Sequence, residues 1–521
     1  MASRYDSTMH VNDSVQYEMP TQPRKPNPGE GVKLMFDEDH FLDARTLPFT
    51  IGQKESAKVN LGMFMKAQGE FAERPAVFSG DITAAFGSYV SPSVEGSLGT
   101  ASRTGDLLFR ARYTATKGKL ENQDNQFGSA GVSGGVHLPD DAGMFSRGRL
   151  SADLGFDIER YKLYGSVTPD RQRTVRHLDG AVKLSSSYSD DAFVKAALHV
   201  HAMSAGDSTT SREMQAGLEL SGGFSFDRTQ LSMTANLWKD FYDAPFAGSN
   251  PSVVDCGVNV RHRFARFEFA AGTALFLHHG SDGDAKLSVS PRMEVVWRVL
   301  EGVSLFGAYR PTVERNSLSS LLKSNPYLFG DVRIRHAEYF QNASGGVELE
   351  AGRRMKAKVS VHYKRGWNVP VFVDVNNLHR WSVAYFGTTR IVALESAIYV
   401  EAADDIMLGA VTTMQTTRNL DSESSLPYAP RVSVRGFYTH RFPFALQFHT
   451  DAEYVGQRYA DVANTRSVPA LVIWDAEANY QLTRHLTVGV GVANILDERP
   501  GRWENYPGQA RRFTLSVDAR W

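Results

Sequence analysis

Apolar and polar side chains alternate along most of the chain. From about residue 76 onward, segments of roughly ten to fifteen residues change character at every position, and short clusters of Gly, Asp, Asn, Ser and Pro separate them. This period of two predicts β-strands joined by turns. The last segment keeps the pattern to its end: Phe513, Leu515, Val517, Ala519 and Trp521 form one face, and Arg512, Thr514, Ser516, Asp518 and Arg520 form the other.

The number of these segments suggests an architecture. About 22 of them lie between residue 77 and Trp521, within the range of about 8 to 26 strands found in outer-membrane barrels. Helical periodicity is scarce, and only short stretches such as Ser317 to Lys323 are able to form a helical turn. A soluble sheet also alternates, because one of its faces packs on a core while the other meets water. A soluble all-β protein of lectin-like or hydrolase type is therefore the competing interpretation.

Three features favour a membrane barrel. The polar faces are charged almost throughout, and the apolar faces are rich in small and aromatic residues, as a wet lumen and lipid contact require. The pattern runs from residue 77 to 521 without a helical layer, and very large open sheets are rare. Aromatic residues also lie near segment ends, where a membrane interface accepts their rings: Tyr113, Tyr363, Tyr454, Tyr480 and Trp521. We predict an all-β fold, a transmembrane antiparallel β-barrel of about 22 strands in the cell outer membrane, in contact with its lipid.

Composition narrows the functional classes. The 521 residues carry 57 basic and 58 acidic side chains, and this balance argues against nucleic-acid binding. The single cysteine, Cys256, excludes an intrachain disulfide and a thiolate metal centre. No apolar run reaches the roughly 20 residues of a transmembrane helix. The sequence also lacks a nucleophile elbow, a His-Glu-x-x-His run and a phosphate loop, so we expect no enzyme, no cofactor and no metal.

The first 75 residues differ from the rest. They are polar and interrupted by proline, as at Pro20 to Pro28, which predicts an extended leader or a partial plug before a barrel at residues 76–521. The start of the sequence has no apolar segment of a secretion signal.

The C-terminal quarter resembles the TonB-dependent outer-membrane receptor family. The resemblance rests on Pro427-Tyr428-Ala429-Pro430, Tyr454-Val455-Gly456-Gln457-Arg458-Tyr459, Val492-Ala493-Asn494-Ile495-Leu496-Asp497 and the terminal aromatic residue. Upstream, Asn325-Pro326-Tyr327-Leu328 followed by Gly345-Gly346-Val347-Glu348-Leu349 resembles the mid-barrel pattern of the same family.

The resemblance implies transport or uptake of a substrate across the outer membrane. It also implies a globular plug and an N-terminal box for an energising partner, neither of which is recognisable in the leader. The alternative is therefore a plugless barrel that anchors or houses a periplasmic or lumen-filling protein partner. Trp521 is similar to the aromatic end that the barrel assembly machinery recognises, and we expect it to serve as a membrane-insertion signal or simply as a lipid-facing ring.

Charged residues on the predicted polar faces are the candidate lumen residues. The basic candidates are able to form an anion-preferring ring, or to belong to a mixed wall that pairs opposite charges across strands. His199 and His201 share a strand face and suggest either a metal pair or ordinary lumen histidines, and His278 and His279 are expected in a loop. The lumen candidates are Arg110, Arg112, Arg261, Arg263, Asp451, Glu453, Asp475 and Glu477.

Overall fold

The strands close into a ring. The computed structural model describes residues 77–521, apart from 103, 140–141, 147, 190, 244–248, 353, 375 and 500. Each wall strand pairs antiparallel with the next one along the chain, and the last pairs with the first, which gives a closed barrel of 22 strands, as the alternation predicted. The leader expected at residues 1–75 lies outside the described residues.

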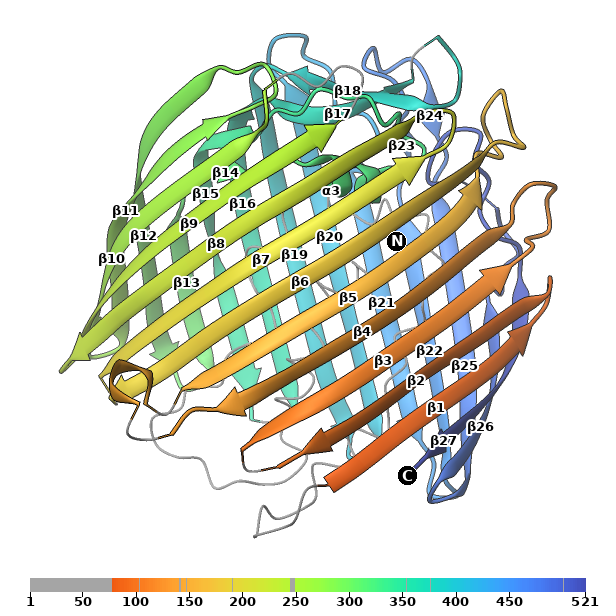
Figure 1. Cartoon of the computed structure of the whole chain (residues 1–521), viewed down its shortest axis with the longest axis horizontal. Coiled ribbons are helices and arrows are strands. Elements are labelled where there is room, and N and C mark those ends of the chain that lie inside the picture. Colours follow the sequence, from red (N-terminus) through yellow and green to blue (C-terminus); the bar gives the residue numbers. More distant parts are fainter. Residues whose placement is uncertain are drawn as a thin grey trace.

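Most of the described elements are wall strands (Figure 1). β13 and β14 occupy one wall position, because both pair with β15. The first wall strands are β1 (Val77–Gly87), β2 (Ser91–Ala101), β3 (Gly105–Thr116), β4 (Asn125–His137), β5 (Arg149–Lys162), β6 (Gln172–Ser189), β7 (Ala192–Gly206), β8 (Thr210–Phe226), β9 (Thr229–Asp243), β10 (Ser252–Phe264) and β11 (Phe267–His279). The others are β12 (Ala285–Leu300), β13 (Val303–Tyr309), β14 (Thr312–Glu314), β15 (Ala337–Ala351), β16 (Met355–Trp367), β19 (Thr389–Ala403), β20 (Ile406–Asn419), β21 (Val432–Arg441), β22 (Leu446–Val455), β25 (Leu471–Thr483), β26 (Leu486–Ala493) and β27 (Arg512–Arg520).

A smaller group of elements lies in the connections. The helix α3 (Leu318–Ser324) forms where the sequence predicted a helical turn, and the 3-10 helix η2 (Gly143–Phe145) is shorter still. Two hairpins pair outside the wall sheet. They are β17 (Val369–Asp374) with β18 (Trp381–Phe386), and β23 (Arg458–Tyr459) with β24 (Ser467–Val468). No helix in these ranges is both long and apolar enough to cross a membrane.

The two ends of the barrel differ. At one end, which we call the turn end, strands are joined by short turns such as residues 301–302 and 404–405. At the other, the loop end, the connections include residues 315–336, 368–388 and 494–511. The main buried apolar cluster lies among these loops, because the wall itself has lipid on one side and the lumen on the other.

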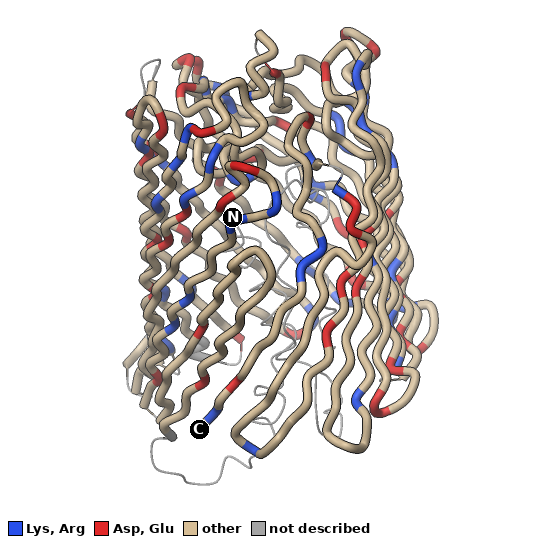
Figure 2. The backbone as a smooth tube through the Cα atoms, turned by 90° about the vertical axis from the view of Figure 1, so that its right-hand side faces the viewer, with Lys and Arg blue, Asp and Glu red and all other residues tan. Residues whose placement is uncertain are grey.

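Side-chain alternation gives the wall its two faces. In β7, Leu198 and Val200 are exposed on the outer face, whereas His199 and His201 point to the inner one. Lys and Arg are interleaved with Asp and Glu along the strands (Figure 2). The near-neutral total charge thus corresponds to a wall of mixed sign.

Candidate functional site

Aromatic side chains from several loops pack together at the loop end. Tyr327 and Tyr506 stack with their ring centroids 3.5 Å apart. Trp381 donates a hydrogen bond from Nε1 to the Tyr428 hydroxyl, 3.1 Å away, and Trp503 packs against the same tyrosine. All five side chains are at most 2% exposed, although they come from four connections that are far apart in the sequence. We call these five residues the aromatic cap.

A buried ion cluster lies beside the aromatic cap. The Asp207 carboxylate contacts the guanidinium groups of Arg173 and Arg380, with Arg380 Nη2 2.7 Å from Oδ2. Arg173 Nη1 also donates to the carbonyl oxygens of Pro326 and Leu328, at 2.7 and 2.5 Å. Burial alone would raise the pKa of Asp207, but the Arg173 and Arg380 charges and the Ser208 amide outweigh burial and hold this pKa below its usual value. The cluster thus joins wall strands to the loops through a carboxylate that is charged at neutral pH.

Helix α3 is anchored to the wall by its first turn. The Glu213 carboxylate of β8 accepts hydrogen bonds from the amides of Leu318 and Ser319, both at 2.8 Å. His201 Nε2 lies 3.1 Å from the Ser319 hydroxyl, and Ser317 caps the helix by accepting from the Ser320 amide. The loop at residues 315–336 is therefore held against the wall by polar contacts from neighbouring strands.

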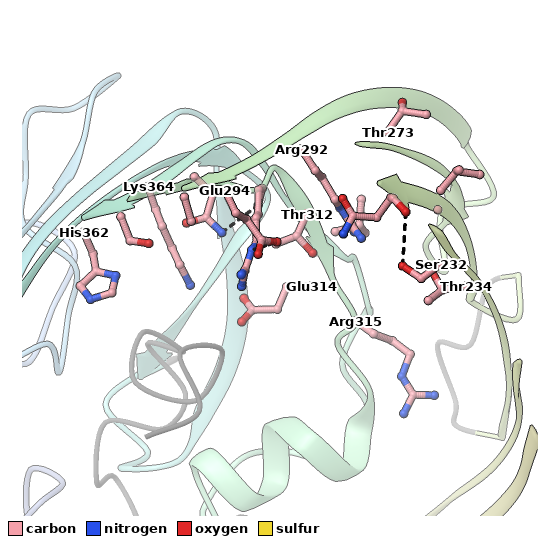
Figure 3. A pocket seen from close by; sticks show the side chains of 18 residues that line it. Ser232, Thr234, Thr273, Arg292, Glu294, Thr312, Glu314, Arg315, His362 and Lys364 are labelled. Carbon is pink, nitrogen blue, oxygen red and sulfur yellow. Dashed lines mark hydrogen bonds and ion pairs between the residues drawn. The ribbon is translucent and has the colours of Figure 1, made fainter. Parts of the chain in front are cut away.

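A polar cavity of about 560 Å³ lies on the inner wall between β9 and β16 (Figure 3). Its lining has four cationic side chains, Arg292, Arg310, Arg315 and Lys364, but only two carboxylates, Glu294 and Glu314. The lining belongs to wall strands and to the segment that leads into α3, so the cavity is near the anchored loop.

The charged lumen candidates lie on the strand faces opposite the exposed apolar residues. Arg261 contacts Glu268 at 3.2 Å and Glu294 at 3.3 Å, and Arg263 lies 2.9 Å from the same Glu268. Arg112 is 3.7 Å from Glu95, and Arg110 shares its strand face. The partners of Arg112, Arg261 and Arg263 are thus carboxylates on adjacent or nearby strands.

The acidic candidates have different partners. Asp451 is 3.9 Å from Arg435, and Glu453 is 2.8 Å from Arg502. Asp475 accepts from the Asn494 amide at 2.7 Å, and Glu477 accepts from Asn479 at 3.3 Å. Asp451 and Glu477 thus contact residues of the wall, whereas Glu453 and Asp475 contact the connection at residues 494–511.

The histidines do not form a metal pair. His201 contacts Asp179 and Ser319, whereas His199 stacks on Trp238 with ring centroids 5.6 Å apart. The prediction that His278 and His279 lie in a loop is wrong, since β11 extends through His279 and pairs with β12. Across the described ranges, no three His, Cys, Asp or Glu side chains are grouped so as to hold a metal ion.

Sequence reasoning missed the role of the loops. In the sequence, the motifs containing Tyr327 and Tyr428 indicate only the family resemblance, whereas in the structure the two residues belong to the aromatic cap. Arg173, Asp207 and Glu213 carry no motif at all. A usable signal was the set of aromatic residues beside Pro, outside the alternating segments, at Tyr327, Tyr428 and Tyr506.

A closed membrane barrel with an inner polar face, and with buried loop side chains packed at one end, defines an outer-membrane barrel protein, not a soluble sheet protein. The family model "TonB dependent receptor-like, beta-barrel" matches residues 77–495, and the chain belongs to this family. It is an outer-membrane protein, and uptake across that membrane is favoured over the alternative of a barrel that houses a partner. No curated protein matches the sequence.

Solved structures share the fold at low sequence identity. The FrpB iron transporter from Neisseria meningitidis matches with a TM-score of 0.67 and 14% identity, over 85% of this chain and 81% of that one. The siderophore receptor PirA from Acinetobacter baumannii gives 0.67 and 10%, over 87% and 81%. The copper transporter OprC gives 0.66 and 12%, over 86% and 81%.

Proposed function

We propose that this barrel takes up a small substrate through its lumen and that the loop end is the gate. The observation that carries the proposal is the aromatic cap, a buried cluster of loop side chains above a polar lumen. In outer-membrane barrels the longer loops face the exterior and the short turns face the periplasm. A substrate therefore meets the aromatic cap first and the inner wall next.

The comparison structures support uptake without naming the substrate. Their titles describe transport of iron and copper and a siderophore receptor. An enzymatic role has no support from the family.

The partners of the barrel follow from its class. An energising periplasmic protein would supply the work of opening, as the receptor family implies. The barrel assembly machinery would recognise the end of β27, with Trp521 as the insertion signal. Trp521 is 55% exposed on the outside, and its backbone exchanges hydrogen bonds with Gly80 at 3.0 and 3.1 Å.

Replacing the anchored loop tests the gate. Thr312–Glu314 pair with Ala337–Tyr339, so a two-glycine turn in place of residues 315–336 would leave the wall intact. We expect this variant to conduct ions steadily in planar bilayers, with larger and more frequent openings than the unaltered protein, because α3 and Tyr327 are gone.

Heat-modifiable gel mobility provides the folding control for this loop replacement. A variant that folds fully yet conducts no better than the parent protein would contradict the proposed gate.

A further inference from the structure

The lining of the wall cavity between β9 and β16 carries more cationic than anionic side chains. The carboxylate of Glu294 is already shared by two guanidinium groups, with Arg310 Nε at 2.8 Å and Arg261 Nη2 at 3.3 Å. Its negative charge is thereby neutralised within the wall. Arg292 and Lys364 then add positive charge to the same lining.

Among the cations of the cavity lining, Arg292 gives the strongest indication of a ligand. It extends from β12 on the inner face, next to the cavity, and its guanidinium lies over the Phe276 ring, 5.6 Å from the centroid. Its Nε is buried and has no hydrogen-bond partner in the described part of the chain, where Arg292 also forms no ion pair. A buried Nε–H donor without an acceptor is costly, and a bound anion would supply the acceptor.

The neutral lining indicates what the anion is attached to. Hydroxyl and carboxamide side chains line the cavity from β9 and β15, among them Ser232, Thr234, Asn342 and Ser344. No Phe, Tyr or Trp is among the described lining residues, although Phe276 lies beneath Arg292. This lining offers hydrogen bonds to hydroxyl groups but no flat apolar surface for an aromatic ligand.

From this combination we propose that the cavity binds a hydroxylated organic anion, a sugar-like skeleton bearing a carboxylate or a phosphate. The anionic group contacts Arg292 and the neighbouring cations, and the hydroxyls contact the Ser, Thr and Asn side chains. A cavity of about 560 Å³ has the size of a small-molecule site. The proposal rests on the proposed uptake function and specifies its substrate class.

Titration calorimetry on the folded full-length protein in detergent tests this assignment. The probes are D-gluconate, D-glucose 6-phosphate, D-glucose and inorganic phosphate. We expect both charged sugars to bind, and to bind roughly tenfold or more tightly than glucose or phosphate. The ratio between gluconate and glucose 6-phosphate then tells whether the carboxylate or the phosphate is preferred. Equal binding of glucose and its charged derivatives, or no binding of either charged sugar, would overturn the assignment.

Two variants with opposite expected effects locate the site. Arg292→Gln removes the unpaired guanidinium and should weaken both charged sugars roughly tenfold while leaving glucose unchanged. Glu294→Gln removes the carboxylate that occupies Arg261 and Arg310 and should tighten the charged sugars. Unchanged affinities in both variants would place the ligand elsewhere.

A matched control and an independent readout complete the test. Arg149→Gln removes a guanidinium from the inner face of β5, where it pairs with Asp106 at 2.5 Å outside the cavity lining, and should alter no affinity. The bilayer conductance of the loop-replaced barrel does not depend on these probes. If binding fails while that conductance rises as expected, the substrate class is wrong and the gate stands.

Discussion

At the scale of single residues, Asp207 has the most constrained position in the loop end. Its side chain is 5% exposed and lies between Arg173, which is 2% exposed, and Arg380, which is 6% exposed. Loss of one partner from a buried ion pair leaves an uncompensated charge and costs about 3–5 kcal/mol. Here it would leave two guanidinium groups facing each other beside the aromatic cap.

Acid should therefore loosen the aromatic cap through Asp207. The folded pKa lies below the ordinary value of 3.8, so the carboxylate stabilises the cap fully above about pH 4, and this stabilisation is lost as the pH falls through the folded pKa. We expect tryptophan fluorescence emission to shift to the red on acidification below pH 4, because Trp381 and Trp503 become exposed to water.

Asp207→Asn is the control for this pH dependence. Its emission should already be shifted at neutral pH and should change less on acidification. Identical acid profiles of the variant and the parent would show that another carboxylate controls the aromatic cap.

At the scale of elements, α3 is too short to be stable alone and depends on the wall for its structure. The helix has no acidic residue of its own in its first turn, and the Glu213 carboxylate from β8 supplies that charge instead. The same loop is held further along by Arg173, which contacts the carbonyl of Pro326. The loop that contains α3 is thus held at two points, and the loss of either contact should make it more mobile.

Glu213→Ala should release the first of these points. Each hydrogen bond to a charged group contributes about 1.5–3 kcal/mol, and two of them would be lost at Leu318 and Ser319. We expect trypsin to cleave after Lys323 several-fold faster in folded protein, measured by mass spectrometry of the fragments.

Glu213→Gln keeps one acceptor oxygen and should show an intermediate cleavage rate after Lys323. Cleavage at the parent rate in the alanine variant would mean that Glu213 does not hold the helix.

The elements also show how far the sequence predicts the structure. Strand existence, strand number and the helical turn near Ser317 were predictable, because lipid on one face and water on the other impose a local period of two. The ion partners were not predictable in the same way. Arg261 contacts Glu268 and Glu294, because strand register decides which polar side chains become neighbours, and alternation alone does not fix register.

The candidate site was less predictable than the fold. The aromatic cap joins residues such as Tyr327 and Tyr506, which are far apart in the sequence and belong to irregular loops. Whether these residues come into contact depends on the circumference of the barrel and on the paths of the loops. A local sequence pattern predicts neither of these. The cavity around Arg292 depends on the same global geometry.

At the scale of the whole molecule, the barrel depends on the pairing of β1 with β27. Gly80 lies at this pairing, which we call the seam, and a side chain at residue 80 would clash with the indole ring of Trp521. A Cβ atom at Gly80 would stand 2.6 and 2.8 Å from two Trp521 ring atoms and 3.0 Å from the Ser97 carbonyl oxygen. The absence of a side chain at residue 80 thus allows Trp521 to lie against the first strand.

Gly80→Val should accordingly impair closure. Overpacking of this kind costs about 1–3 kcal/mol, and we expect a smaller fraction of heat-modifiable, folded barrel after expression. Gly155→Val is the matched control, because nothing lies within 4 Å of a Cβ at that strand position.

The double variant Gly80→Val with Trp521→Ala should recover part of the folded fraction. If the single variant folds as well as the control, the contact between residue 80 and Trp521 has no bearing on closure.

The seam also has a consequence for how the polypeptide reaches its native state. The hydrogen bond from the Thr83 hydroxyl to Asp518 joins residues 435 positions apart, whereas nearly every other strand pair is local along the chain. The loop-closure entropy of that one step is the largest in the molecule, and the two edges it joins remain unpaired until the final strand arrives. Folding should therefore begin with rapid formation of successive hairpins, and the pairing of β1 with β27 should be the slow last step. The lifetime of the unclosed sheet then sets the risk of aggregation.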